Sequence, residues 1–177
     1  LSYQADISHC GYQMVFPKGH VDYYYNSGRL EQFDQETGLK ALIEGSYIEP
    51  GLWNKLFHRK LFDRLLSDDL MDISIRINED ALMNYYLFDK AEKSVFEGVC
   101  PYHYILRQDS ASCKGISENY VFDPIRVRQI LLERCAPEMR DDVRNALMRN
   151  LLFNYAQLDT HTDREKLKDF RVRVRQL

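Results

Sequence analysis

The amino-acid sequence predicts an α/β domain, with a mixed sheet and flanking helices, that is followed by an α-helical tail. Three observations lead to this fold class. Residues 5–16 and 93–107 are rich in strand-forming residues. Residues 79–91 lie between them and are mainly apolar, which indicates a helix buried against a sheet. From Ile116 onward, apolar residues recur at helical spacing.

The first part of the chain divides into short elements separated by turns. Residues 5–16 alternate apolar and polar side chains, and the turn sequence PKGH leads to an expected returning strand at 21–26. A helix is expected near 34–45. Residues 50–66 are expected to form a short strand or turn and then a helix, and residues 68–77 a polar loop.

The helix expected over residues 79–91 has an acidic start. Asn78 suits the N-cap position, and Glu79 and Asp80 fall in the first turn, where the helix dipole favours anions. Residues 93–107 then predict one or two strands, with a proline at an edge or bend.

The tail is expected to contain two or three helices. Asp123 and Pro124 suggest the cap and first turn of one helix, and a second helix is expected after Pro137. We therefore divide the chain into residues 1–115 and residues 116–177. A last segment places four apolar residues on one helical face: Leu167, Phe170, Val174 and Leu177.

Composition restricts the classes of function. The 177 residues are 45% hydrophobic and 29% charged, which is typical of a globular protein. The net charge of −3 provides no overall positive field to attract nucleic acid. No apolar stretch is long enough to cross a bilayer. The four cysteines are scattered without a C-x-x-C, which favours reduced thiols in a cytoplasmic protein: Cys10, Cys100, Cys113 and Cys135.

Three clusters contain residues suited to chemistry. Each has an ordinary structural interpretation when taken alone, such as a helix start, a core aromatic, or a strand end with a polar turn. In chain order, the candidates are Trp53 and Lys55; Glu79 and Asp80; and Arg107, Ser110 and Ser112.

Taken together and in this order, the clusters resemble the second half of the catalytic domain of family 2 glycosyltransferases, which are nucleotide-sugar enzymes with the GT-A fold. Members often show a W-N-K-L-F/Y-like segment, an E-D pair opening a helix, and Y-x-Y-x-x-R-x-x-S-x-S. The resemblance covers residues 1–115. The matching residues are Trp53-Asn54-Lys55-Leu56-Phe57, Glu79-Asp80, and Tyr102, Tyr104, Arg107, Ser110 and Ser112.

The resemblance implies an inverting, hexosyltransferase-type reaction. Asp80 would be the base that accepts a proton from the acceptor hydroxyl, with Glu79 as its supporting neighbour. Arg107 would offer a fork of donors to the departing diphosphate. Ser110 and Ser112 would add hydroxyl contacts, and Trp53 and Lys55 would shape the acceptor side. For the last two, plain packing of Trp53 and a solvated Lys55 are an equally open interpretation.

The sequence departs from the family at the metal site. GT-A enzymes bind a divalent metal (Mg or Mn) and the nucleotide through a D-x-D motif, and this chain contains no Asp-x-Asp. We therefore expect the acceptor-side half of a longer enzyme, inactive alone, whose donor is a nucleotide sugar and whose acceptor is a saccharide or a lipid-linked sugar. The processive signature Q-x-x-R-W is also missing, which favours single-sugar transfer. Family habit points to bacterial surface polysaccharide or cell-wall glycan synthesis at the inner face of the membrane.

Two other classes of protein are alternatives to a glycosyltransferase. A hydrolase with two carboxylates is disfavoured because adjacent residues at a helix start cannot straddle one bond. A non-catalytic interaction module, with the Tyr-rich segments as its partner surface, fits the composition as well as an enzyme does.

Two contacts with partners are also expected. The arginines of the tail could touch anionic lipid headgroups, although a solvated basic face is the more ordinary interpretation. These are Arg171, Arg173 and Arg175. A truncated sheet would also leave a strand edge unpaired, so a homodimer formed through strands near residues 5–25 is expected.

Overall fold

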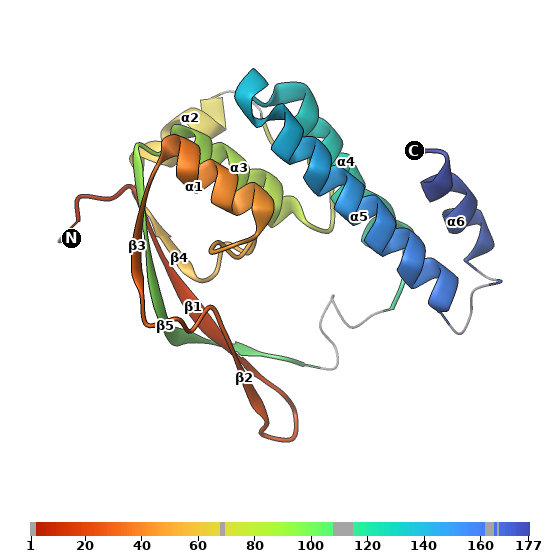
Figure 1. Ribbon diagram of the computed structural model, residues 1–177, viewed down its shortest axis with the longest axis horizontal. Coiled ribbons are helices and arrows are strands. Elements are labelled where there is room, and N and C mark those ends of the chain that lie inside the picture. The colour runs from red at the N-terminus through yellow and green to blue at the C-terminus, as the bar shows by residue number, and fades with distance from the viewer. Residues whose placement is uncertain (1–2, 68–69, 108–114, 162–164, 166) are drawn as a thin grey trace. The chain divides into compact units, whose positions relative to one another are not determined.

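The computed structural model describes residues 3–67, 70–107, 115–161, 165 and 167–177. The chain forms two compact units (Figure 1). The first unit comprises Leu1–Asp72 and Asp80–Gly115, and the second comprises Ile73–Glu79 and Ile116–Leu177. Nothing in the sequence pattern predicts that residues 73–79 belong with the helices of the tail.

A mixed sheet forms one layer of the first unit. Its described strands are β1 (Ile7–Val15), β2 (Val21–Tyr24), β3 (Leu30–Asp34), β4 (Lys55–Phe57) and β5 (Lys93–Ile105). The order is β2-β1-β5-β3, and β4 also pairs with β1. Strands β1 and β5 are parallel, whereas the other pairs are antiparallel. The predicted α/β class with a mixed sheet is confirmed.

The strands expected at 5–16, 21–26 and 93–107 are present, but β3 was missed. Its five residues, LEQFD, contain only two apolar side chains, and these do not alternate with period two. The strand nevertheless forms because its backbone pairs with β5 over its whole length. Tertiary pairing therefore overrides a weak local pattern here.

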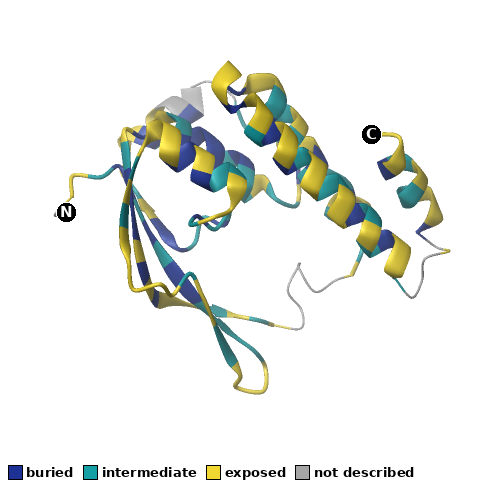
Figure 2. Ribbon diagram, viewed as in Figure 1, coloured by how far each residue is buried: buried dark blue, intermediate teal, exposed yellow. Residues whose placement is uncertain are grey.

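Two helices cover one face of the sheet, and their sides toward the sheet are buried (Figures 1 and 2). The first is α1 (Gln35–Glu44), whose N-cap is the side chain of Asp34. The second is α3 (Glu79–Lys90), which buries a continuous apolar side. Both agree with the helices expected at 34–45 and 79–91. A third helix, α2 (Lys60–Ser67), follows β4, as expected for residues 50–66.

A histidine lies in the core between the sheet and these helices. His9 is 3% exposed, and its ring lies 5.3 Å from the ring of Phe96 and 5.9 Å from that of Phe88. Neither ring nitrogen has a hydrogen-bond partner among the described residues. Burial, together with the charge of Lys55, lowers the pKa of His9 to about 3. His9 is therefore neutral at neutral pH.

The start of α3 differs from the expected N-cap. Asn78 has a φ of 70°, in the left-handed region, whereas an N-cap residue is normally extended. Its Oδ1 accepts a hydrogen bond from Nη1 of Arg128 at 3.3 Å. The side chain of Asn78 is thus held by a helix of the second unit, and Asn tolerates the left-handed backbone better than most residues.

The second unit is helical. It contains α4 (Glu118–Arg134), the short 3₁₀ helix η2 (Pro137–Met139), α5 (Arg140–Thr160) and α6 (Lys168–Arg175). The prediction that Asp123 and Pro124 begin a helix is wrong. Helix α4 begins at Glu118, Oγ of Ser117 accepts a hydrogen bond from the Tyr120 amide, and Pro124 lies inside the helix.

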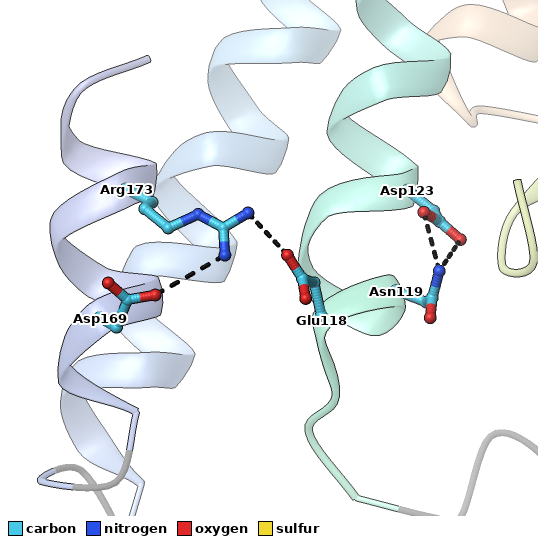
Figure 3. Close-up of polar contacts among 5 residues, drawn as sticks. All are labelled: Glu118, Asn119, Asp123, Asp169 and Arg173. Atoms are coloured by element: carbon cyan, nitrogen blue, oxygen red, sulfur yellow. Dashed lines mark hydrogen bonds and ion pairs between the residues drawn. The ribbon is translucent and has the colours of Figure 1, made fainter. Parts of the chain in front are cut away.

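A small apolar core and surface polar contacts hold these helices together. The buried core consists of Val121, Ile125, Leu158, Leu167 and Val174. Arg173 of α6 forms ion pairs with Glu118 at 2.7 Å and Asp169 at 3.6 Å (Figure 3). Its guanidinium also lies 4.1 Å from the ring centre of Phe122.

Asp123 has a role other than capping. It is buried, and Oδ2 accepts hydrogen bonds from the backbone amides of Arg76 at 2.8 Å and Ile77 at 3.0 Å. The Nδ2 of Asn119 donates to the same carboxylate (Figure 3). This carboxylate therefore fastens residues 73–79 to α4.

We expect Asp123→Ala to lower the free energy of unfolding by about 1–3 kcal/mol, because it leaves two backbone donors without their acceptor. Asp141→Ala is the matched control, since Asp141 is exposed and forms only a surface ion pair with Arg144. Urea denaturation monitored by circular dichroism measures both variants. Equal losses for the two would show that Asp123 does not anchor the segment.

Candidate functional site

The candidate site is built where α3 begins beside the loop of residues 49–54. Asp80 lies in the first turn of α3 and is half-buried. Its Oδ2 accepts a hydrogen bond from the backbone amide of Leu52 at 3.5 Å. Glu79, by contrast, is exposed. The fold thus brings Asp80 to the segment that contains the W-N-K motif, 28 positions away in the chain.

Lys55 occupies the interior of the site rather than its surface. It is the first residue of β4, pairs with His9 across β1 and is 8% exposed. Its Nζ donates to the carbonyl oxygens of Glu49 and Gly51, both at 2.5 Å, and to Oδ1 of Asn54 at 2.9 Å. The interpretation of Lys55 as a solvated side chain is therefore wrong.

Two buried amide side chains hold the same loop. Asn84 of α3 is fully buried, and its Nδ2 donates to the carbonyl oxygen of Pro50. Asn54 is also buried, and its Nδ2 donates to the carbonyl oxygen of Cys10 on β1 at 2.6 Å. The loop is consequently attached to both the sheet and α3.

A second carboxylate was not anticipated from the sequence. Glu49 accepts a hydrogen bond from the hydroxyl of Tyr12 at 3.4 Å, and burial raises the pKa of its carboxyl group. Glu49 precedes the W-N-K motif by only four positions, but nothing in its neighbours marks it as buried. Tyr12 is buried too, and the buried environment raises the pKa of its phenol.

The electrostatics of the site centre on Lys55. Burial lowers the pKa of Lys55 to about 8, although the charges of Glu49 and Asp80 act in the opposite direction. The site therefore holds one ammonium that attracts two carboxylates.

Trp53 braces the site from the side of the sheet. Its ring lies 4.8 Å from the ring of Tyr102 and 5.1 Å from that of Tyr104, both on β5, and its edge meets Tyr12 at 4.8 Å. A Cβ on residue 51 would lie 2.4 Å from the indole Nε1, so glycine is needed there. The first and third sequence clusters therefore meet through their aromatic residues.

The phosphate-binding candidates are only partly described. Arg107 follows β5 and is exposed. Ser110 and Ser112 lie outside the described residues. Within the described part of the chain, no hydrogen bond or ion pair joins Arg107 to Asp80 or to the 49–54 loop.

A divalent metal is expected in the longer enzyme, at a D-x-D motif that this sequence lacks. Among the residues that the structure describes, no three His, Cys, Asp or Glu side chains are placed to hold a metal ion. The metal of the longer enzyme stays a prediction.

The arginines of the tail are mostly engaged within the protein. Arg171 forms an ion pair with Asp159 at 2.5 Å, and Arg173 pairs as described above. Contact between the tail and a lipid surface stays a prediction. In the described part of the chain, no helix combines the length and apolar character needed to span a bilayer.

No protein-family model matches the sequence, and a comparison with curated proteins gives no match. The support for a function therefore comes from the sequence motifs and from the geometry of the site.

Proposed function

We propose that the chain forms the acceptor side of an inverting glycosyltransferase. This enzyme would transfer one sugar from a nucleotide-diphosphate sugar to a saccharide or lipid-linked acceptor, in the synthesis of bacterial surface polysaccharide or cell-wall glycan. The observation that supports it most is the placement of Asp80. Its carboxylate lies at the start of a buried helix and accepts a hydrogen bond from the backbone amide of Leu52. The buried ammonium group of Lys55 attracts it.

This arrangement suits a general base. Inverting transfer requires one group that accepts the proton of the acceptor hydroxyl as that oxygen attacks the anomeric carbon. Among the described residues, Asp80 accepts a hydrogen bond at Oδ2 alone, from the Leu52 amide, so Oδ1 is left to meet a hydroxyl. Helix α3 is fixed by a largely buried side, which holds the carboxylate in a constant position.

The proposal assigns other residues to supporting roles. Arg107 would donate to the diphosphate that leaves the donor sugar. Trp53 packs on Tyr102 and Tyr104, so we assign it to bracing the loop rather than to stacking on a sugar. The test of this proposal is to measure sugar transfer by a complete enzyme that contains this chain and a donor-binding half. Absence of transfer with every nucleotide sugar tested would overturn the proposal.

One observation favours a second candidate, the non-catalytic interaction module. On the side of the sheet away from α1 and α3, a cavity of about 230 Å³ is open to solvent. Leu30 and Leu56 line it, and both side chains are exposed. Strand β3 also pairs with β5 alone among the described strands, so one of its edges is free. Such an edge can pair with a second copy of the chain.

If this face and the free edge of β3 pair two copies, the protein should dimerise with increasing concentration, and Leu30→Lys, on β3, should weaken the dimer at least about tenfold. Ile73→Lys is the matched control, because Ile73 is an exposed aliphatic residue in the second unit. Sedimentation velocity distinguishes the two variants. A monomer at all concentrations would remove the support for this candidate.

A further inference from the structure

We propose that Lys55 is a positioning residue whose ammonium group fixes the 49–54 loop, so that the Leu52 amide meets the carboxylate of Asp80. The part of this inference that concerns catalysis rests on the proposed function of Asp80. The part that concerns the loop does not.

The geometry at Nζ is the first step. An ammonium group has three N–H donors, and Lys55 has three acceptors in place. Two of them are carbonyl oxygens of the loop, at Glu49 and Gly51, and the third is the side chain of Asn54. One buried cation thus ties together both ends of a segment that has no regular secondary structure.

The next step follows the backbone of the loop. The carbonyls of Glu49 and Gly51 bind Lys55, and the carbonyl between them, at Pro50, binds Asn84. Three successive carbonyl groups are therefore held in fixed directions. The N–H of Leu52 belongs to the same peptide group as the carbonyl of Gly51, and it donates to Asp80. If Lys55 released the carbonyls of Glu49 and Gly51, the Leu52 amide would lose its fixed direction.

The charge on Lys55 is the last step. The ionisable groups that face it are Glu49 in the loop, Asp80 on α3, and His9 and Cys10 on β1. His9 is neutral well above its pKa of about 3, and burial raises the pKa of Cys10. Because its pKa is about 8, Lys55 changes charge between pH 7 and 9. A neutral amine has one donor fewer and no attraction for the two carboxylates, so the loop should loosen as Lys55 deprotonates.

The chain contains a suitable reporter, because Trp53 is its only tryptophan and lies two positions from Lys55. We expect the fluorescence of Trp53 to change in one step with a midpoint near pH 8. The backbone amide resonance of Leu52 in a ¹⁵N-labelled sample should shift with the same midpoint. In Lys55→Met the step should be absent, and in Lys18→Met, which changes an exposed lysine in the turn after β1, it should persist.

Two variants test whether the step belongs to Lys55. Removing a neighbouring negative charge destabilises the ammonium form, so Glu49→Gln and Asp80→Asn should each lower the midpoint, by roughly 0.5–1 pH unit. Glu49→Gln should have the larger effect, because Glu49 acts more strongly on Lys55 than Asp80 does. Both shifts can be measured without a substrate.

A wild-type titration in which the fluorescence of Trp53 shows no step between pH 7 and 11, a range that includes the ordinary pKa of a lysine, would overturn the inference, even if Lys55→Met failed to fold. A step that persists in folded Lys55→Met would also overturn it. The outcome is separable from the proposed function. If the step is found but Asp80→Asn keeps normal transfer, the loop inference stands and the assignment of Asp80 as the base fails.

Discussion

In the proposed glycosyltransferase, Asp80→Asn should reduce the turnover number of the complete enzyme by about 100-fold or more, the usual contribution of a positioned general base. The amide cannot accept the proton of the acceptor hydroxyl, but it has nearly the size of the carboxylate. Its carbonyl oxygen can still accept the hydrogen bond from the Leu52 amide that Oδ2 of Asp80 accepts now. The variant should therefore fold normally, and the affinity for the nucleotide sugar should change little.

Glu36→Gln is the matched control for this experiment. Glu36 is an exposed glutamate in the first turn of another helix, α1, and we expect a change in turnover of less than about tenfold. Initial rates of sugar transfer at saturating donor measure both variants, and circular dichroism confirms that they are folded. Near-normal transfer by folded Asp80→Asn would show that Asp80 only begins the helix.

The wild type should lose stability in acid because of His9, and His9→Phe should remove most of that loss. In the folded protein the pKa of His9 is about 3, whereas an unfolded histidine titrates near 6.5. Between these two values the unfolded state binds a proton that the folded state does not. Stability therefore falls as the pH is lowered from 6.5 to 3, and at pH 4.5 the loss from His9 alone is about 2–3 kcal/mol.

The test compares the free energy of unfolding of His9→Phe with that of the wild type at two pH values. The free energy of unfolding of His9→Phe minus that of the wild type should rise by about 2–3 kcal/mol between pH 7.5 and pH 4.5. Any cost of fitting the phenyl ring among the aromatic side chains around residue 9 is present at both pH values and cancels. His103→Phe, at an exposed position of β5, should show no such rise. If the two variants behave alike, His9 is not the buried neutral group described here.

The sequence was sufficient for the regular elements whose pattern is local. Helix α3 could be predicted because its apolar residues are continuous, and β1 because its side chains alternate. Strand β3 could not, since its pairing with β5 depends on residues 59 to 67 positions away. The start of α4 was misplaced for a similar reason, because Asp123 looks like a cap in sequence but binds two backbone amides at residues 76 and 77.

Only part of the candidate site, and none of its contacts, could be predicted from the sequence. The motif identified Lys55 and Asp80, yet a lysine in a short strand gives no sign that it is buried with three oxygen acceptors. Asn84 is one polar residue in an apolar helix, and the residues around Glu49 do not indicate that Glu49 is buried. Buried polar groups find their partners through tertiary structure, and one sequence carries little information about that pairing.

The way in which the 49–54 loop is held has a consequence for evolution and for protein engineering. Lys55 and Asn84 bind the backbone carbonyls of residues 49–51, and Asp80 binds a backbone amide. These contacts depend on the length of the loop much more than on its side chains. Position 52 should therefore accept many amino acids in a saturation library, whereas insertion or deletion of one residue between 49 and 55 should be almost absent from the surviving clones.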